Sequence, residues 1–228
     1  MRVNKLAISS FIIFSFLITP AYALEEGIEV TGTAKEAVAP DMATFLFSVN
    51  GRGKELANLK AEIDKKTAAT VAICKNLGVK TKNITSAEIS IRPQYNYQTK
   101  SFTGYEVSRN IKVILENLDK YSELVNGVIK SGVTTINNIH LDTKDREVLE
   151  RKALGAAIAS ARKKAEIIAK SSDAKIGKVI YVKEGGGPIR LESYKFTQRG
   201  KEASLAQGAF EPGEISLSAT VSVRYSIK

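Results

Sequence analysis

The sequence predicts an α+β fold, in which helices cover one face of long, mainly antiparallel β-strands. Three segments alternate apolar and polar residues with a period of two, the pattern of a strand with one buried and one solvated face. Three other segments repeat apolar or small residues at helical spacing. Placed in chain order with four weaker strand segments, they give β-β-α-β-β-α-β-α-β-β.

The three alternating strands are Ala43 to Val49, Tyr105 to Leu115, and Ile215 to Ile227. The last would run about 40 Å at about 3.3 Å per residue, which is unusually long. Such strands are longer than the predicted helices can cover. The four weaker strand segments are Gly27–Ala34, Ile84–Tyr97, Val133–Asp142 and Lys175–Glu184.

The predicted helices differ in the side chains of their apolar stripe. Lys54 to Leu77 carries larger apolar residues and ends at Gly78, a residue that readily adopts the left-handed C-cap conformation. Leu118 to Lys130 is shorter and stops before Gly132. Thr143 to Ser171 is rich in alanine, and its small side chains would allow close approach to a sheet or to another helix.

The first residues predict export. Arg2 and Lys5 precede an apolar run, Leu6 to Ile18, and a small-x-small site ends at Ala23. The competing interpretation is a transmembrane anchor, but this run has thirteen residues, and a span needs about 20. We therefore expect a signal peptide at residues 1–23, no transmembrane segment, and a periplasmic protein with one domain over 24–228.

One long segment, residues 185–214, shows no periodicity and contains GGGP and EPGE. Loops of this length are uncommon inside a compact domain unless they are disordered or contact something. The sequence thus predicts an irregular loop here, either disordered or dependent on a partner.

The residue types that most active sites need are scarce. Cys74 and His140 are the only cysteine and histidine, so clustered metal ligands and a Ser-His-Asp or Cys-His site are not expected. Cys74 falls on the apolar stripe of its helix, which indicates a buried, inert thiol. A glycosidase pair could come only from scattered carboxylates, and the sequence brings no two of them together. We predict no catalytic, cofactor-binding or metal-binding residues, and therefore a protein that is not an enzyme.

The basic charge suggests a second class of function. The formal net charge is +10, and the signal segment contributes two of these charges, leaving +8. A basic surface attracts acidic partners such as lipid headgroups, cell-wall polymers or nucleic acid. The lysines and arginines are spread along the chain without a long basic block, so we expect at most weak contact with an acidic envelope polymer, such as lipopolysaccharide or peptidoglycan, and no nucleic-acid binding.

The stretch IRPQYNYQTKSFTGYEV concentrates aromatic residues in a chain without tryptophan. Its aromatic side chains are Tyr95, Tyr97, Phe102 and Tyr105. They could form a ligand platform, but the flanking periodicity favours a hairpin with its tip near Thr99–Gly104. A free two-stranded hairpin is marginal in water. We therefore expect its aromatic face to contact a neighbouring subunit or the protein's own helices.

Several short motifs in a fixed order resemble one known family. They include VTGTA at Val30–Ala34, NLGV at Asn76–Val79, IRPQYNY, and EPGEISLSATVSVRYSI at the C-terminus. In this order they resemble the bacterial SIMPL-domain proteins, also catalogued as a domain of unknown function and as the 26 kDa periplasmic immunogenic protein. The resemblance covers about Ile28 to Ile227.

The resemblance implies an exported α+β protein that assembles into a large hollow or channel-like homo-oligomer. It also implies a link of some members to oxidative-stress defence, and it supplies no catalytic residues. Our hypothesis is therefore a non-enzymatic periplasmic homo-oligomer that acts as an envelope or stress-related assembly, without a cofactor. The alternative is a binding module for an acidic envelope polymer.

Overall fold

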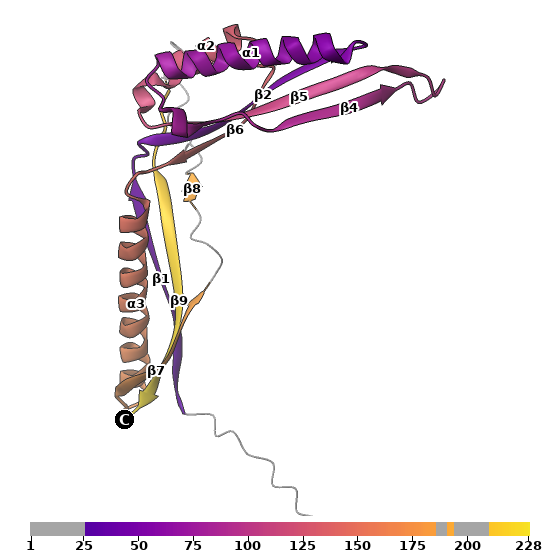
Figure 1. Cartoon of the computed structure of the whole chain (residues 1–228). Helices are drawn as coiled ribbons and strands as arrows, with labels where there is room; N and C mark the ends of the chain where they lie inside the picture. Colours follow the sequence, from indigo (N-terminus) through magenta and orange to yellow (C-terminus); the bar gives the residue numbers. More distant parts are fainter. Residues whose placement is uncertain (1–25, 186–190, 194–209) are drawn as a thin grey trace, which may run out of the picture.

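The computed structural model describes residues 26–185, 191–193 and 210–228, which form an L with two arms (Figure 1). Each arm is an antiparallel sheet with its own helix layer, so the predicted α+β class is confirmed. The predicted signal peptide and most of the predicted loop lie outside the described residues. Within the described ranges, no helix is long and apolar enough to cross a membrane.

The lower arm in Figure 1 is built from both ends of the chain. Its sheet has the order β1 (Gly27–Val38), β9 (Ile215–Ile227), β7 (Ile176–Gly185), and β8 (Leu191–Ser193) also pairs with β9. One long helix, α3 (Arg146–Ser171), packs on β1 and β9. All strand pairs are antiparallel, and β1 pairs with β9 along its whole length.

The upper arm contains the middle of the chain. Its sheet has the order β3-β5-β2-β6, and β4 pairs with β5 beyond β3. Two helices cover one face of this sheet and also contact each other. The elements are β2 (Met42–Gly53), α1 (Leu56–Asn76), a 3₁₀ turn (Thr81–Asn83), β3 (Ile84–Thr85), β4 (Ile89–Tyr95), β5 (Phe102–Leu115), a second 3₁₀ turn (Leu118–Lys120), α2 (Tyr121–Lys130) and β6 (Thr135–Asp142).

The core of the lower arm is made of small residues in very close contact. The buried face of α3 includes Ala157 and Ala161. They lie against Gly32 of β1, where an added Cβ would be 2.0 Å from the Ala157 carbonyl oxygen and 2.7 Å from the Ala161 Cβ. The small-residue face predicted from the sequence therefore lets the backbones of helix and strand approach each other.

The core of the upper arm uses large side chains instead. Phe45 and Phe47 of β2 are fully buried, with ring centroids 5.3 Å apart. Ile63 of α1, Ile111 of β5 and Leu124 of α2 are also fully buried and belong to the same cluster. The apolar faces predicted by the period-two alternation are thus the faces that the helices cover.

The structure differs from the predicted elements in three places. The strands form two sheets rather than one, because β1 pairs with β9 and not with β2. The predicted strand at 84–97 is divided into β3 and β4. Thr85 pairs with Lys112, and Ile89 pairs with Arg109. Four residue steps from β3 to β4 therefore lie opposite three residue steps along β5. This one-residue excess interrupts the ladder. Lastly, the short strand β8 lies inside the segment predicted to be irregular.

The helix layers lie on the outer sides of the L, so the uncovered faces of both sheets turn towards its inner angle (Figure 1). The arms meet where the Asp41 amide donates to the Asp142 carbonyl at 3.2 Å and the Lys144 amide donates to the Asp41 carboxylate at 3.0 Å. At this junction, Phe210, shortly before β9, stacks on Tyr121 of α2 with ring centroids 3.6 Å apart.

Candidate functional site

The four aromatic residues singled out in the sequence lie on the hairpin of β4 and β5, and three of them form a row. Tyr95 meets Phe102 edge to face with ring centroids 5.8 Å apart, and Phe102 meets Tyr105 in the same way at 5.1 Å. Tyr97 stands apart from this row, in the turn after β4, and is 98% exposed. The structure therefore brings three of the four side chains together.

The row depends on a bulge that period-two alternation does not reveal. Phe102 and Tyr105 are three residues apart and would point to opposite faces of a regular strand. The register shifts between Gln94 and Tyr95, so that Gln94 pairs with Gly104 and Tyr95 with Phe102. Gly104 has a φ of +144°, a conformation that glycine adopts without strain. The glycine was the only signal in the sequence that could have indicated this bulge.

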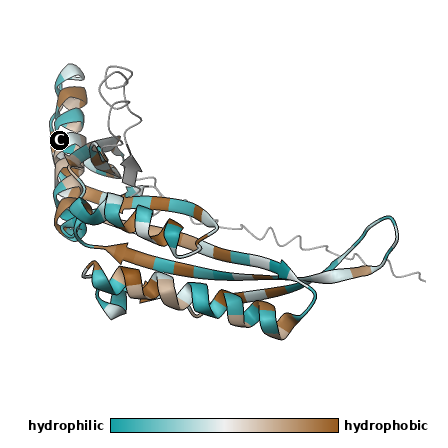
Figure 2. Cartoon of the chain, turned by 90° about the horizontal axis from the view of Figure 1, so that it is seen from above, coloured by the Kyte–Doolittle hydropathy of each residue, from teal (hydrophilic) through white to brown (hydrophobic). Residues whose placement is uncertain are grey.

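The exposed end of the hairpin extends beyond the helix that covers the rest of its sheet (Figures 1 and 2). Val107, under α1, is fully buried, whereas Ile91, its partner on β4, is 43% exposed. Further out, Tyr95 is 55% exposed and Phe102 is 47% exposed. The apolar face of the upper sheet therefore continues, uncovered, past the start of α1.

The tip of the hairpin has a defined hydrogen-bonded turn. The side-chain oxygen of Asn96 accepts from the amides of Gln98 and Thr99 at 2.9 and 3.1 Å. The Asn96 amide donates to the Ser101 carbonyl at 2.9 Å. Asparagine side chains commonly close turns in this way. These bonds fix the strands that carry the aromatic row.

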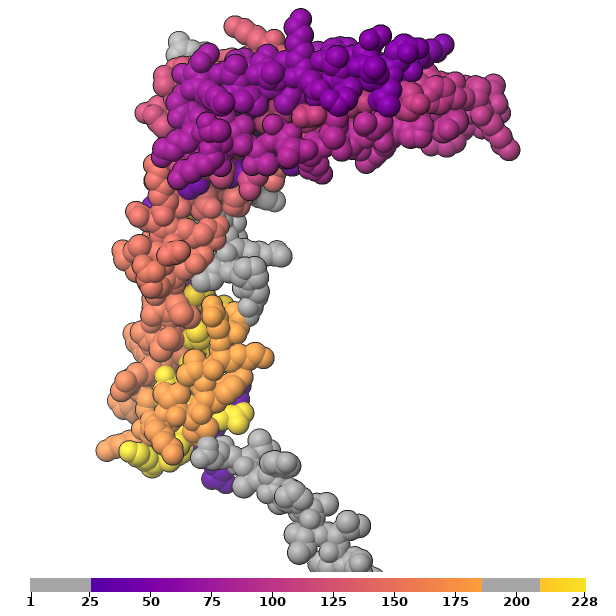
Figure 3. Space-filling view, viewed as in Figure 1, coloured from indigo at the N-terminus to yellow at the C-terminus, as the bar shows by residue number. Residues whose placement is uncertain are grey.

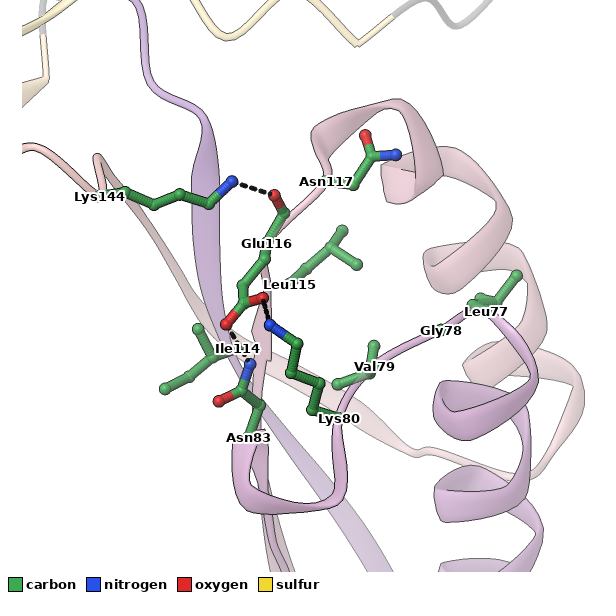
Figure 4. A pocket seen from close by; sticks show the side chains of 10 residues that line it. All are labelled: Leu77, Gly78, Val79, Lys80, Asn83, Ile114, Leu115, Glu116, Asn117 and Lys144. Atoms are coloured by element: carbon green, nitrogen blue, oxygen red, sulfur yellow. Dashed lines mark hydrogen bonds and ion pairs between the residues drawn. The ribbon is translucent and has the colours of Figure 1, made fainter.

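A second candidate is the pocket beyond the C-terminal end of α1, a cavity of about 240 Å³ (Figure 4). Its central group is the Glu116 carboxylate, which accepts from Lys80 at 2.6 Å and from Asn83 at 2.8 Å. These bonds hold the Glu116 pKa below its usual value, with Lys80 as the larger cause. Lys144 donates to the Glu116 carbonyl at 2.9 Å. Because these groups bond to one another, they stabilise the end of the sheet, and the pocket offers a ligand few groups to bind.

The single cysteine and the single histidine lie on different elements of the upper arm, α1 and β6. Cys74 is fully buried in the upper core, and this burial raises the pKa of its thiol to about 11. His140 is exposed on β6 opposite Thr44. Among the described residues, no three side chains of the His, Cys, Asp and Glu types are placed to hold a metal ion. Asp41 and Asp142 meet at the junction of the arms, and each carboxylate has a basic neighbour. The Lys144 Nζ lies 3.9 Å from the Asp41 carboxylate, and the Arg146 Nε lies 3.2 Å from the Asp142 carboxylate.

Comparison with known proteins gives relatives that match most of the chain. The chain is 30% identical over 190 residues to an uncharacterized protein, YggE, of Edwardsiella ictaluri, and the match covers 80% of each chain. YggE of Escherichia coli K12 is also 30% identical, over 187 residues, which are 80% of this chain and 76% of YggE. The 26 kDa periplasmic immunogenic protein of Brucella melitensis is 23% identical over 226 residues, 92% of this chain and 90% of that protein.

The match to a family model is nearly complete. The SIMPL model, described as a protein of unknown function (DUF541), covers residues 28–225, which include almost all of both arms. The motifs that suggested this family are placed throughout the structure, from VTGTA in β1 to the alternating residues of β9. The chain belongs to the SIMPL family.

Proposed function

We propose that the protein is an exported, non-enzymatic envelope protein that works as a homo-oligomer joined through the aromatic face of its projecting hairpin. The observation that carries the proposal is the row of Tyr95, Phe102 and Tyr105 continuing an apolar sheet face beyond the helix layer. Aromatic side chains on a fixed scaffold are favourable contact residues, because they bury a large area with little loss of conformational entropy. The Brucella relative, named a periplasmic protein, supports the proposed location.

The hairpin favours contact through its face rather than through its edge. Its outer strand, β4, contains Pro93, which lacks the amide that an added strand would need. A second copy could instead place its own aromatic row against this one, with edge-to-face packing between the rings. Such self-complementary contact is typical of two-fold symmetric dimers, from which larger assemblies can grow through further contacts.

Direct removal of oxidants is not part of this proposal. The only thiol, Cys74, is buried and its pKa is raised to about 11, so it is protonated near neutral pH and reacts slowly with oxidants. A role in stress would follow from the assembly itself.

The test is the mass of the mature chain, residues 24–228, measured by size-exclusion chromatography with light scattering at micromolar concentration. We expect an oligomer, and we expect the double variant Tyr95→Ser/Phe102→Ser to associate at least about tenfold more weakly, since it loses two aromatic contacts. Ile167→Ser is a matched control, because Ile167 is 58% exposed but lies on α3, in the other arm.

Circular dichroism should be unchanged in both variants, because the three substituted side chains are exposed. A strictly monomeric mature chain would refute the assembly. An oligomer unchanged by the double variant would refute the hairpin as its contact.

A further inference from the structure

The tip of the hairpin carries an aromatic ring that takes no part in the aromatic row. Tyr97 is 98% exposed and lies in the turn between β4 and β5. In Figure 3, the hairpin is the far end of the upper arm and extends in magenta beyond the purple helix α1. Nearly all of the apolar surface of this ring is in water, so a contact that removes it from water is favourable.

A cation lies in the same turn. Lys100 is exposed and has a backbone φ of +54°, a left-handed conformation that glycine and asparagine adopt with less strain. The turn therefore carries a positive charge at a position where the backbone favours a small residue. This departure from local preference supports a role for the charge.

The end of the hairpin has a positive net charge. Lys100 is the only charged residue within residues 93–105. The next charged residues along the two strands are Arg92 and Glu106, which pair with each other in the sheet register. The Glu106 carboxylate accepts from the Arg52 Nη2 at 3.0 Å, whereas Arg92 is exposed and forms no ion pair with a described residue. Both free cations of the hairpin end are therefore available to an anionic partner.

We propose that the tip of the hairpin binds the surface of an anionic lipid bilayer, with the Tyr97 ring among the headgroups and Lys100 against their phosphates. Tyrosine favours the membrane–water interface because its ring is apolar and its hydroxyl bonds to water and headgroups. A lysine near the surface adds electrostatic attraction to anionic lipids, and its apolar stem lets the charge stay at headgroup depth. The contact is interfacial, and no part of the hairpin crosses the bilayer.

Two other classes of partner fit the tip less well. A protein partner normally meets a patch with an apolar centre, whereas the neighbours of Tyr97 in the turn, Asn96, Gln98 and Thr99, are polar. A nucleic acid is bound through many cations and several stacking rings, and this turn has one of each. A bilayer surface is soft and flat, so one ring and one cation at the end of a projecting element can reach it.

The lipid contact is separate from the proposed contact between copies. Tyr97 stands apart from the row of Tyr95, Phe102 and Tyr105, so lipid at the tip leaves the row free for a second copy. One tip supplies a weak contact, and several tips on one surface bind more tightly than one. The assembly thus adds strength, but the contact itself does not require it.

The test uses the mature chain with Tyr97→Trp, because the sequence contains no other tryptophan and the emission then reports on the tip alone. The protein is titrated at about 20 mM salt with vesicles of phosphatidylglycerol and phosphatidylcholine in equal parts. We expect the emission to shift to shorter wavelength and to be quenched by lipids brominated near the headgroup. Tyr181→Trp is the matched control, because Tyr181 is 42% exposed on β7 in the lower arm, and its emission should not change.

Substitutions at the tip separate the ring from the charge, with binding measured by vesicle flotation. Lys100→Gly should bind about fivefold more weakly, the loss expected for one cation near an anionic surface, although glycine suits the backbone of the turn. Lys100→Arg keeps the charge and should bind as well as the unchanged protein. Tyr97→Ser should also weaken binding about fivefold, while the mass of the protein in solution stays the same.

The lipid contact and the assembly can therefore fail separately. A monomeric mature chain would refute the assembly and leave the shift of Tyr97→Trp as the test of the lipid contact. The proposal is overturned if that emission is unchanged by anionic vesicles. It is equally overturned if polyphosphate shifts the emission as the vesicles do, since a soluble polyanion would then be sufficient, or if vesicles of phosphatidylcholine alone bind as tightly.

Discussion

Gly32 and Gly155 are two glycines of the lower arm with opposite surroundings. A Cβ at Gly32 would lie 2.0 Å from the Ala157 carbonyl oxygen, whereas a Cβ at Gly155, within α3, would meet nothing within 4 Å. We predict that Gly32→Ala lowers the free energy of unfolding by about 1–3 kcal/mol, because the helix must move away from the sheet. Gly155→Ala should raise it by about 0.5–1 kcal/mol, because alanine restricts the unfolded chain and favours the helix.

Urea denaturation followed by circular dichroism would measure both changes. Each variant replaces a glycine of the same arm by alanine and so adds one methyl group. A difference between the two variants therefore reports the space around each glycine and not the change of residue type. Equal effects in the two variants would mean that α3 does not pack as closely on β1 as the distances indicate.

Cys74 should make stability depend on pH in the alkaline range. Burial raises the pKa of its thiol from 9.0 to about 11, so the folded protein favours the protonated form. Its stabilising contribution is complete below pH 9 and is lost as the pH rises towards 11. We predict that the unfolding free energy falls more steeply between pH 9 and 11 in the unchanged protein than in Cys74→Ala. Urea titrations at several pH values would compare the two slopes, and parallel slopes would contradict the prediction.

At the scale of the element, the sequence was informative wherever one face of a strand is buried. The alternation in β2, β5 and β9 predicted which residues point to the core, since water is excluded from one side only. The alanine stripe of α3 likewise predicted close packing. The boundaries were predicted less well. The predicted helix at 143–171 begins at Arg146, because Thr143 and Asp145 form a turn in which the Asp145 amide donates to the Thr143 hydroxyl at 3.3 Å.

The pairing of the elements could not be predicted in the same way. β1 and β9 are separated by most of the chain, and their partnership arises from hydrogen bonds that carry no side-chain signature. For the same reason the division of the strands into two sheets could not be predicted. The aromatic hairpin was predicted, but the row within it depends on the register shift at Tyr95.

At the scale of the whole molecule, the contacts at the junction set the angle between the two arms. Phe210 is the aromatic residue at this junction, stacked on Tyr121 with an interplanar angle of 11°. Tyr121 also lies against Phe45 of the upper core, with ring centroids 5.4 Å apart. A residue close to the start of β9, in the lower sheet, is thus connected through two rings to the centre of the upper arm. This stack should restrict bending of the L.

We predict that Phe210→Ala widens the distribution of angles between the arms while leaving each arm folded, because each sheet keeps its own core. Spin labels at Ala68→Cys on α1 and Lys163→Cys on α3 would report the distance between the arms by pulsed electron resonance, in samples diluted with unlabelled chain. Both positions are exposed, and the buried Cys74 should remain unlabelled. The control is Tyr97→Ala, which removes an exposed aromatic ring in the hairpin turn, outside the aromatic row and far from the junction. A distance distribution equally narrow in Phe210→Ala would mean that the backbone and polar contacts of Asp41, Asp142 and Lys144 fix the angle without the ring stack.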